Sequence, residues 1–232
     1  MMDQELPGCA RCPYQPQRRI CRNEEGKAPP FCPTVNKKAV IARALEELKK
    51  PEILEFARQA SIQEMEGYTD RELGHARVRP LKPRIAEIIE FAGKMKYKKI
   101  GLAFCIGLRK EAKVVESLLA ANGFTVVSGL CKMGRVPKET LGIRDNQKIK
   151  IGCFESMCNP IAQAFLFNEE KTEFNVMIGL CVGHDSLFLK YADAPCTVFA
   201  VKDRLLGHNP LAAIYNIDTF YRSLKVPVRE EE

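Results

Sequence analysis

Four cysteines near the start of the chain have the spacing of a metal site. They follow the pattern C-x2-C-x8-C-x10-C and are Cys9, Cys12, Cys21 and Cys32. Two thiolates separated by two residues can reach the same metal, and two more complete a tetrahedral zinc site or anchor one iron–sulfur cluster. We therefore predict that these four cysteines bind a metal centre.

The same motif favours iron–sulfur over zinc. Pro33 directly follows Cys32, as proline often follows the last cysteine of bacterial ferredoxin motifs. A zinc ribbon would also use two close cysteine pairs, and only one close pair is present here. We expect a [4Fe-4S] cluster, and the alternative of a structural zinc ion at the same four cysteines stays open.

A second group of cysteines occupies similar positions in four separate segments. Cys105, Cys131 and Cys181 each end a short apolar run that predicts a strand, and Cys158 stands just before a predicted helix. In an open parallel sheet, the carboxyl ends of the strands lie at the edge where ligands bind. We predict a second cluster or metal site there. The alternatives are buried core cysteines, which are common, and a dithiol or reactive-thiol site.

The number of thiolates at this edge decides the chemistry, and the sequence leaves it open. Three would leave one iron open to a substrate or sulfide, whereas four would favour electron transfer. His184 is predicted to lie behind the ligands and orient them. A Cys181–His184 nucleophilic pair is the competing interpretation, and it needs spatial contact and a third orienting group. Cys196 is interpreted as a core residue. Cys153 could be a spare ligand, a thiol beside the cluster or a packing residue, and packing is favoured.

The elements that must position these cysteines follow from hydrophobic periodicity. Helical spacing predicts three helices before residue 98, in segments 36–50, 51–67 and 81–97. Apolar runs predict four strands, in segments 98–107, 124–131, 174–181 and 196–201, with helices between them. Asp185 or Ser186 is expected to cap one short helix, and Asn209 another.

Alternating strands and helices predict an α/β fold with a mostly parallel open sheet and flanking helices. Helices and a metal-stapled, cysteine-rich arm precede this sheet. The predicted parts are residues 1–36 as the arm, 37–97 as a helical segment and 98–232 as the α/β domain with the second site.

Composition restricts the setting. Apolar residues make up 46% of the chain, no apolar run is long enough to span a membrane, and the first residues lack a signal pattern. We therefore expect a cytoplasmic location, where ten cysteines point to metal or redox chemistry rather than disulfides. The net charge of +7 indicates a basic surface, including Arg109, Lys132, Arg135, Lys202 and Arg204 near strand ends. Nucleic acid is not the expected partner.

Four motifs together resemble a known family. The motifs are "CARC…C…CP" at residues 9–33, "CNPIAQA" at 158–164, "GLCVGHDSLF" at 179–188 and "VKDRLLGHNP" at 201–210. They are similar to those of uncharacterised cysteine-rich, predicted metal-binding proteins of anaerobic bacteria and archaea, known as a domain of unknown function. The resemblance implies a cytoplasmic metal protein, and it falls on Cys9, Cys12, Cys21, Cys32, Cys158, Cys181 and His184.

The leading hypothesis is an iron–sulfur protein with one or two clusters and redox or sulfur-related chemistry. Its expected partners are a redox protein or a small anionic or sulfur-containing substrate. Two alternatives remain. One is a zinc-stabilised binding module without catalysis, and the other is a thiol-based redox enzyme that uses Cys181 or Cys158.

Overall fold

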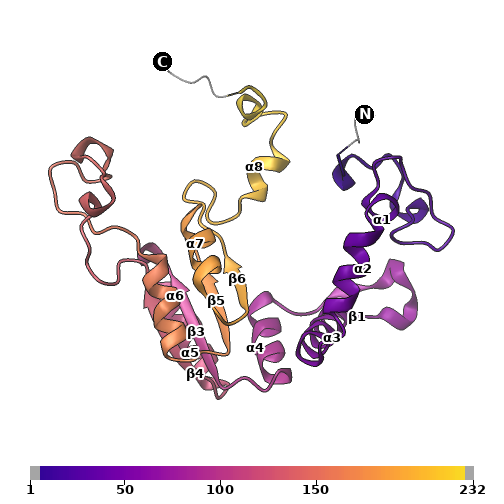
Figure 1. Ribbon diagram of the computed structural model, residues 1–232, viewed down its shortest axis with the longest axis horizontal. Coiled ribbons are helices and arrows are strands. Elements are labelled where there is room, and N and C mark those ends of the chain that lie inside the picture. The colour runs from indigo at the N-terminus through magenta and orange to yellow at the C-terminus, as the bar shows by residue number, and fades with distance from the viewer. Residues whose placement is uncertain (1–5, 228–232) are drawn as a thin grey trace. The chain divides into compact units, whose positions relative to one another are not determined.

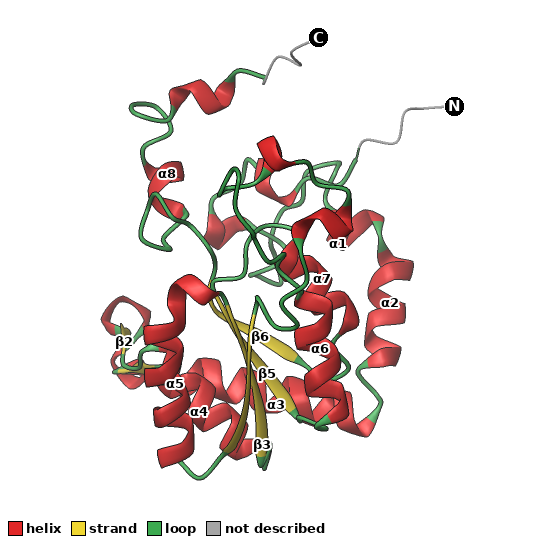
Figure 2. Cartoon of the chain, turned by 90° about the vertical axis from the view of Figure 1, so that its left-hand side faces the viewer, coloured by secondary structure: helices red, strands yellow, loops and turns green. Residues whose placement is uncertain are grey.

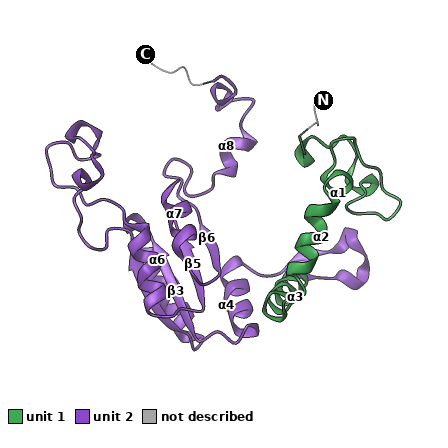
Figure 3. Ribbon diagram, viewed as in Figure 1, with its two compact units in different colours: residues 1–65 green, residues 66–232 purple. Residues whose placement is uncertain are grey.

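A computed structural model describes residues 6–227 of the chain. The chain divides into two compact units, with the boundary between residues 65 and 66 (Figure 3).

The first unit is helical after a loop-rich start. Two short 3-10 turns, Cys9–Arg11 and Pro16–Arg18, precede α1 (Pro33–Asn36), α2 (Lys38–Glu47) and α3 (Pro51–Glu66). Proline at the first position starts both α1 and α3, where its missing N–H group costs nothing. The helices predicted in segments 36–50 and 51–67 are confirmed, and the third is α4 (Arg84–Lys94) in the second unit.

The second unit is built on a four-stranded parallel sheet. Its strands are β3 (Lys99–Phe104), β4 (Thr125–Leu130), β5 (Phe174–Ile178) and β6 (Cys196–Ala200), in the order β4-β3-β5-β6 (Figure 1). Every neighbouring pair in this sheet is parallel. The predicted α/β class and all four strands are confirmed.

Helices cover both faces of the sheet. Figure 2 shows α4 and α5 (Arg109–Ala121) on one face, and α6 (Pro160–Glu169) and α7 (His184–Tyr191) on the other. A short helix, α8 (Leu211–Tyr215), follows the last strand. A hairpin of two-residue strands, β1 (Tyr68–Thr69) and β2 (Arg79–Pro80), precedes α4. It was not predicted, because two residues are too few to show an alternating pattern.

The core lies on the central strands. All five residues of β5 are buried, as are the last five of β3, which is why both strands are continuous apolar runs in the sequence. Phe167 of α6 and Phe188 of α7 are fully buried and pack edge to face, with ring centroids 5.8 Å apart. The centre of the sheet is therefore a rigid support for whatever lies at its carboxyl edge.

The strand order creates a switch point between β3 and β5. The chain passes from β3 to β4 on one side, and then to β5 on the other side of β3. Ligands of open α/β sheets bind outside the carboxyl ends of the strands at such a point. Cys105 follows β3 and Cys181 follows β5, so these two cysteines flank the switch point.

Both capping predictions are wrong. α7 begins at His184 with Gly183 before it, so Asp185 and Ser186 lie inside the first turn, where Asp185 accepts from the Ser186 amide. α8 begins at Leu211 after Pro210, and no side chain caps it. A capping residue must stand directly before the first residue of the helix. Gly183 holds that position for α7, and Pro210 holds it for α8. Within residues 6–227, no helix is both long and apolar enough to cross a membrane.

Candidate functional site

Three cysteine thiols meet at the carboxyl edge of the sheet. The Cys131 thiol lies within hydrogen-bonding reach of both Cys105 and Cys158. Cys105 and Cys131 are buried, with 7% and 3% of their surface exposed, and Cys158 is half-buried. We call these three residues the thiol cluster. It brings together three of the four cysteines predicted for this edge.

Neighbouring strands bring Cys105 and Cys131 together. Phe104 and Leu130 are partners in the β3–β4 ladder, so the next residue of each strand leaves the sheet at the same level. The Cys131 amide then donates to the Phe104 carbonyl at 2.9 Å, and the Ile106 amide donates to the Cys131 sulfur at 3.4 Å. The two thiols are thus fixed by backbone geometry.

Cys158 reaches the cluster because the long connection after β4 folds back on itself. The Asn159 amide donates to the Cys131 carbonyl at 2.7 Å, which closes the loop between the two cysteines. Lys138 and Glu155 form a largely buried ion pair at 2.7 Å within this loop. The Lys138 hydrogen bond lowers the pKa of Glu155 to about 2, so the pair persists across the neutral range.

Cys181, the fourth predicted ligand, lies at the same edge but outside this contact. Its sulfur accepts a hydrogen bond from Arg204 Nη2 at 3.1 Å. His184 begins α7 three residues later and lies close enough to Cys158 for its charge to act on that thiol. The prediction that His184 lies behind the ligands and orients them stays a prediction, and its charge acts on Cys158.

Cations surround the cluster. Lys202 interacts with the Cys105 thiol, and Lys132 interacts with the Cys158 thiol and donates to the Ser156 carbonyl. The sequence placed both lysines near strand ends but gave no sign of which cysteine each would meet. Positive charge beside a thiol favours its thiolate.

The contacts divide the thiols into two kinds. Hydrogen bonding from Cys131, helped by the lysines, lowers the pKa of Cys105 and of Cys158 below the ordinary thiol range. The contacts with Cys105 and Cys158, together with burial, raise the pKa of Cys131. Cys131 has a single S–H proton, so it donates to one neighbour at a time. The contacts therefore favour a protonated Cys131 beside a thiolate neighbour.

No metal-ligand geometry is present in the described chain. Across residues 6–227, no three Cys, His, Asp or Glu side chains are grouped around a common point as ligands of one ion. In the thiol cluster, Cys131 contacts both of the other thiols. A metal would have to replace the two contacts of Cys131 and its proton.

The four N-terminal cysteines are more exposed than the thiol cluster. Cys9 and Cys21 are exposed, Cys12 and Cys32 are half-buried, and the four are not grouped as ligands in the described structure. Arg11 lies over the Phe31 ring, 5.1 Å from its centroid. Because these two residues adjoin Cys12 and Cys32, the contact holds the ends of the motif near each other.

The two remaining cysteines differ. Cys196 is half-buried, accepts from Asn175 Nδ2 at 3.7 Å and donates to the Ala194 carbonyl at 3.2 Å, in agreement with a packing role. Cys153 is exposed, so the prediction that it packs is wrong. It lies on the irregular loop before Cys158, where no apolar periodicity could indicate burial.

Alkylation should reveal the lowered thiol pKa. The ordinary pKa of a cysteine thiol is about 8.5. In protein prepared without metal, we expect Cys158 to react with iodoacetamide at pH values well below that. A lowered pKa keeps the thiolate, and so the reactivity, until the pH falls through that lower value. Cys196 is the control, because burial raises its pKa and its reaction should need a higher pH. Peptide mass spectrometry at a series of pH values measures both, and equal profiles would contradict the assignment.

Gln163 joins the segments that carry the thiol cluster. It is fully buried in the first turn of α6, and its Nε2 donates to the carbonyls of Gly129 at 2.6 Å and Phe104 at 3.3 Å. Those carbonyls stand just before Cys131 and Cys105, and α6 itself starts after Cys158. Sequence analysis did not single out Gln163. The sequence feature that could have indicated it is a single side-chain amide in an otherwise apolar first turn of α6.

Gln163→Met should loosen the cluster at modest cost in stability. Loss of the buried hydrogen bonds is expected to reduce the free energy of unfolding by about 1 kcal/mol. The cost is modest because Gln163 Oε1 has no hydrogen-bond partner among the described residues, so its removal offsets part of the loss. The Cys158 alkylation profile should also move to higher pH, which a purely structural role would not cause. Gln59→Met, on α3, is the control, and an unchanged Cys158 profile in Gln163→Met would exclude a positioning role.

Comparison with known proteins covers most of the chain. A family described as "Protein of unknown function (DUF1847)" matches residues 32–199. A protein of the archaeon Methanocaldococcus jannaschii, named "Uncharacterized protein MJ0455", is 44% identical over 179 residues, which are 77% of this chain and 85% of that protein. No solved structure matches.

The family model matches a shorter part of the chain than the four motifs, which extend from residue 9 to residue 210. It includes the thiol cluster, Cys181 and His184, and it leaves out Cys9, Cys12 and Cys21. The sheet-edge cysteines thus lie within the range that the family model matches. The chain belongs to the DUF1847 family of proteins of unknown function.

Proposed function

We propose that the thiol cluster and Cys181 bind an iron–sulfur cluster at the carboxyl edge of the sheet. The observation that supports this is the meeting of Cys105, Cys131 and Cys158, which come from three separate segments of a cysteine-rich chain. Thiolates are soft ligands that suit iron–sulfur clusters and zinc. A second metal centre is proposed at Cys9, Cys12, Cys21 and Cys32.

The surroundings of the sheet-edge cysteines fit such a group. Two of the three clustered thiols already favour the thiolate form that a metal requires. Lys202, Lys132 and Arg204 each lie beside a different thiol and would offset the negative charge of thiolate ligands. Cys131 must give up the proton that it otherwise holds, so its deprotonation is a step that metal binding has to drive.

The position of Cys181 bears on the chemistry. A bound cluster would supply electron transfer if four thiolates hold it, or an open coordination site if three do. In the described structure Cys181 is hydrogen-bonded to Arg204 and apart from the other three, so ligation by Cys181 requires this bond to shift. The proposed partners are accordingly a redox protein, or a small anionic or sulfur-containing substrate.

Metal analysis tests the proposal. Protein purified without oxygen should be brown, and it should contain about four iron and four sulfide atoms per cluster, or about eight of each if both sites are filled. Zinc without acid-labile sulfide would replace the iron–sulfur proposal by the zinc-stabilised module. Iron bound without sulfide would also contradict it.

A thiol-based redox enzyme is the second candidate, and the lowered pKa of Cys158 favours it. The Cys158 thiolate would attack a disulfide substrate, which releases one thiol and leaves a mixed disulfide on Cys158. Cys131 would then attack the Cys158 sulfur and release the second thiol. The substrate would gain two electrons and leave as two thiols, while Cys131 and Cys158 would form a disulfide. This candidate predicts that reduced, metal-free protein reduces one equivalent of a disulfide substrate, and that Cys158→Ser loses this reaction. Repeated turnover would need an added thiol reductant such as dithiothreitol to reopen the Cys131–Cys158 disulfide.

A further inference from the structure

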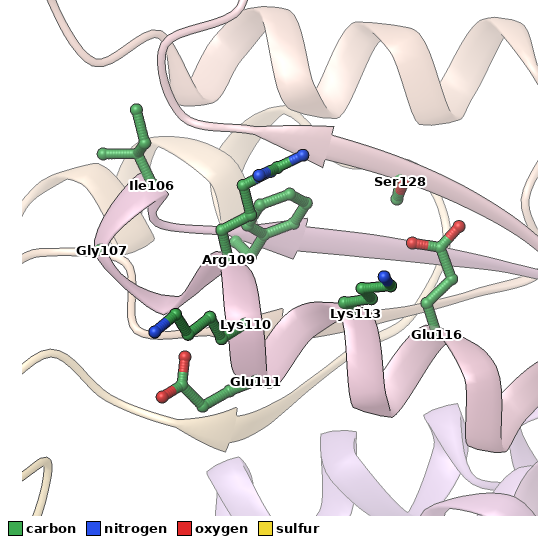
Figure 4. Close-up of a pocket in the computed structure, with 9 residues that line it drawn as sticks. Ile106, Gly107, Arg109, Lys110, Glu111, Lys113, Glu116 and Ser128 are labelled. Carbon is green, nitrogen blue, oxygen red and sulfur yellow. The ribbon is translucent and has the colours of Figure 1, made fainter.

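A pocket of about 830 Å³ lies between α5 and the edge strand β4, beside the thiol cluster (Figure 4). Its volume is within the range of roughly 300–1,000 Å³ that is typical of small-molecule sites. Phe104, Ile106 and Gly107 line one part, and Ser128 of β4 lines another. All remaining lining residues are charged and belong to α5.

The charges of the pocket favour an anion. Arg109, Lys110 and Lys113 stand against Glu111 and Glu116, which leaves one positive charge in excess. Arg109 and Lys113 are four residues apart, so they share one face of the helix. Figure 4 shows both projecting from α5 on the side of Ser128. Within the described chain, neither cation forms an ion pair or a side-chain hydrogen bond, so both are free to bind a ligand.

One end of the pocket reaches the thiol cluster. Ile106 and Gly107 form the turn directly after Cys105, and the Ile106 amide contacts the Cys131 sulfur. At Gly107, the place of a missing Cβ is 3.1 Å from Lys202 Nζ and 3.9 Å from Cys105 Sγ. Because Gly107 has no side chain, no Cβ atom separates the pocket from the Lys202 ammonium group and the Cys105 thiol.

We propose that this pocket binds a small organic anion that carries a carboxylate or phosphate group. Arg109 and Lys113 would hold the anionic group, because the planar guanidinium suits two-oxygen recognition and lysine adds a point charge. The rest of the molecule would extend along Ile106 and Gly107 toward Cys105. Its role as a substrate rests on the proposed function, but its binding does not.

Calorimetric titration of the purified full-length chain tests the binding. The probes are inorganic phosphate and succinate, with neutral succinamide as the control ligand. We expect at least one of the two anions to bind and succinamide not to bind, with affinity that weakens as salt is added. The anion that binds more tightly identifies the chemical group, phosphate or carboxylate.

Matched variants locate the site. Arg109→Gln and Lys113→Gln should each weaken binding about tenfold or more. Arg43→Gln and Lys38→Gln, at exposed positions of α2, remove the same charges and should leave the affinity unchanged. Circular dichroism checks that each variant folds.

Two results would overturn the pocket proposal. One is no binding of either anion at millimolar concentration, and the other is equal weakening in the α5 and α2 variants. Iron and sulfide are counted on the same samples. Anion binding in protein without iron would contradict only the iron–sulfur proposal. Iron in protein that binds no anion would contradict only the pocket proposal.

Discussion

Cys131→Ser is expected to abolish metal binding at the sheet edge. Cys131 is the thiol that contacts both Cys105 and Cys158, and a serine hydroxyl is a poor ligand for iron. Iron and sulfide should each fall by about four atoms per chain relative to the wild type. The measurement is elemental and sulfide analysis of protein purified without oxygen.

Cys196→Ser is the matched control for this prediction. Cys196 is a half-buried cysteine of the same sheet, but its sulfur contacts Asn175 and Ala194 instead of the thiol cluster. It should keep the full iron content. Cys181→Ser should lower the content, because Cys181 is the proposed fourth ligand. Full iron in Cys131→Ser would show that the thiol cluster is not a metal site.

Gly101→Ala is expected to have the largest effect on stability. Gly101 lies in the buried strand β3, where an added Cβ would overlap Asn175 Oδ1 and come within 2.6 Å of the Phe167 ring. Asn175 Oδ1 accepts a hydrogen bond from Thr172 at 2.8 Å, which the overlap would disturb. Overpacking and a disturbed buried hydrogen bond together should lower the free energy of unfolding by about 3 kcal/mol.

Gly93→Ala provides the control in chemical denaturation. Gly93 is in α4, and apart from its chain neighbours and its own helix backbone, no atom of the described residues lies within 4 Å of the place of its missing Cβ. Alanine there should raise the free energy of unfolding by about 0.5–1 kcal/mol, because glycine is a poor helix former. A Gly101→Ala variant as stable as the wild type would mean that β3 and α6 do not pack as closely as described.

The sheet was predictable because its signals are local. β3 and β5 are continuous apolar runs that end in cysteine, and a parallel sheet places such strand ends at one edge. The meeting of Cys105 with Cys131 follows directly from this geometry. The three helices before residue 98 were likewise marked by apolar spacing and proline.

The remaining features of the site depend on contacts far apart in sequence. Cys158 joins Cys131 only because the Asn159 amide closes a long irregular loop, which no periodic pattern could reveal. Cys181 pairs with Arg204, and Gln163 reaches two strand ends, through side-chain contacts that follow from the packing of α6 and the last loop. The pocket beside α5 could not be predicted from the charges of that helix, because alternating charges on a helix are typical of a solvated surface.

The most direct test of the sheet-edge site removes the N-terminal one. A Cys12→Ser/Cys21→Ser double variant keeps Cys105, Cys131, Cys158 and Cys181 as its candidate ligands, and its iron and acid-labile sulfide can be counted after purification without oxygen. The proposed site predicts about four iron and four sulfide atoms per chain. A folded, colourless double variant without iron or sulfide would contradict it.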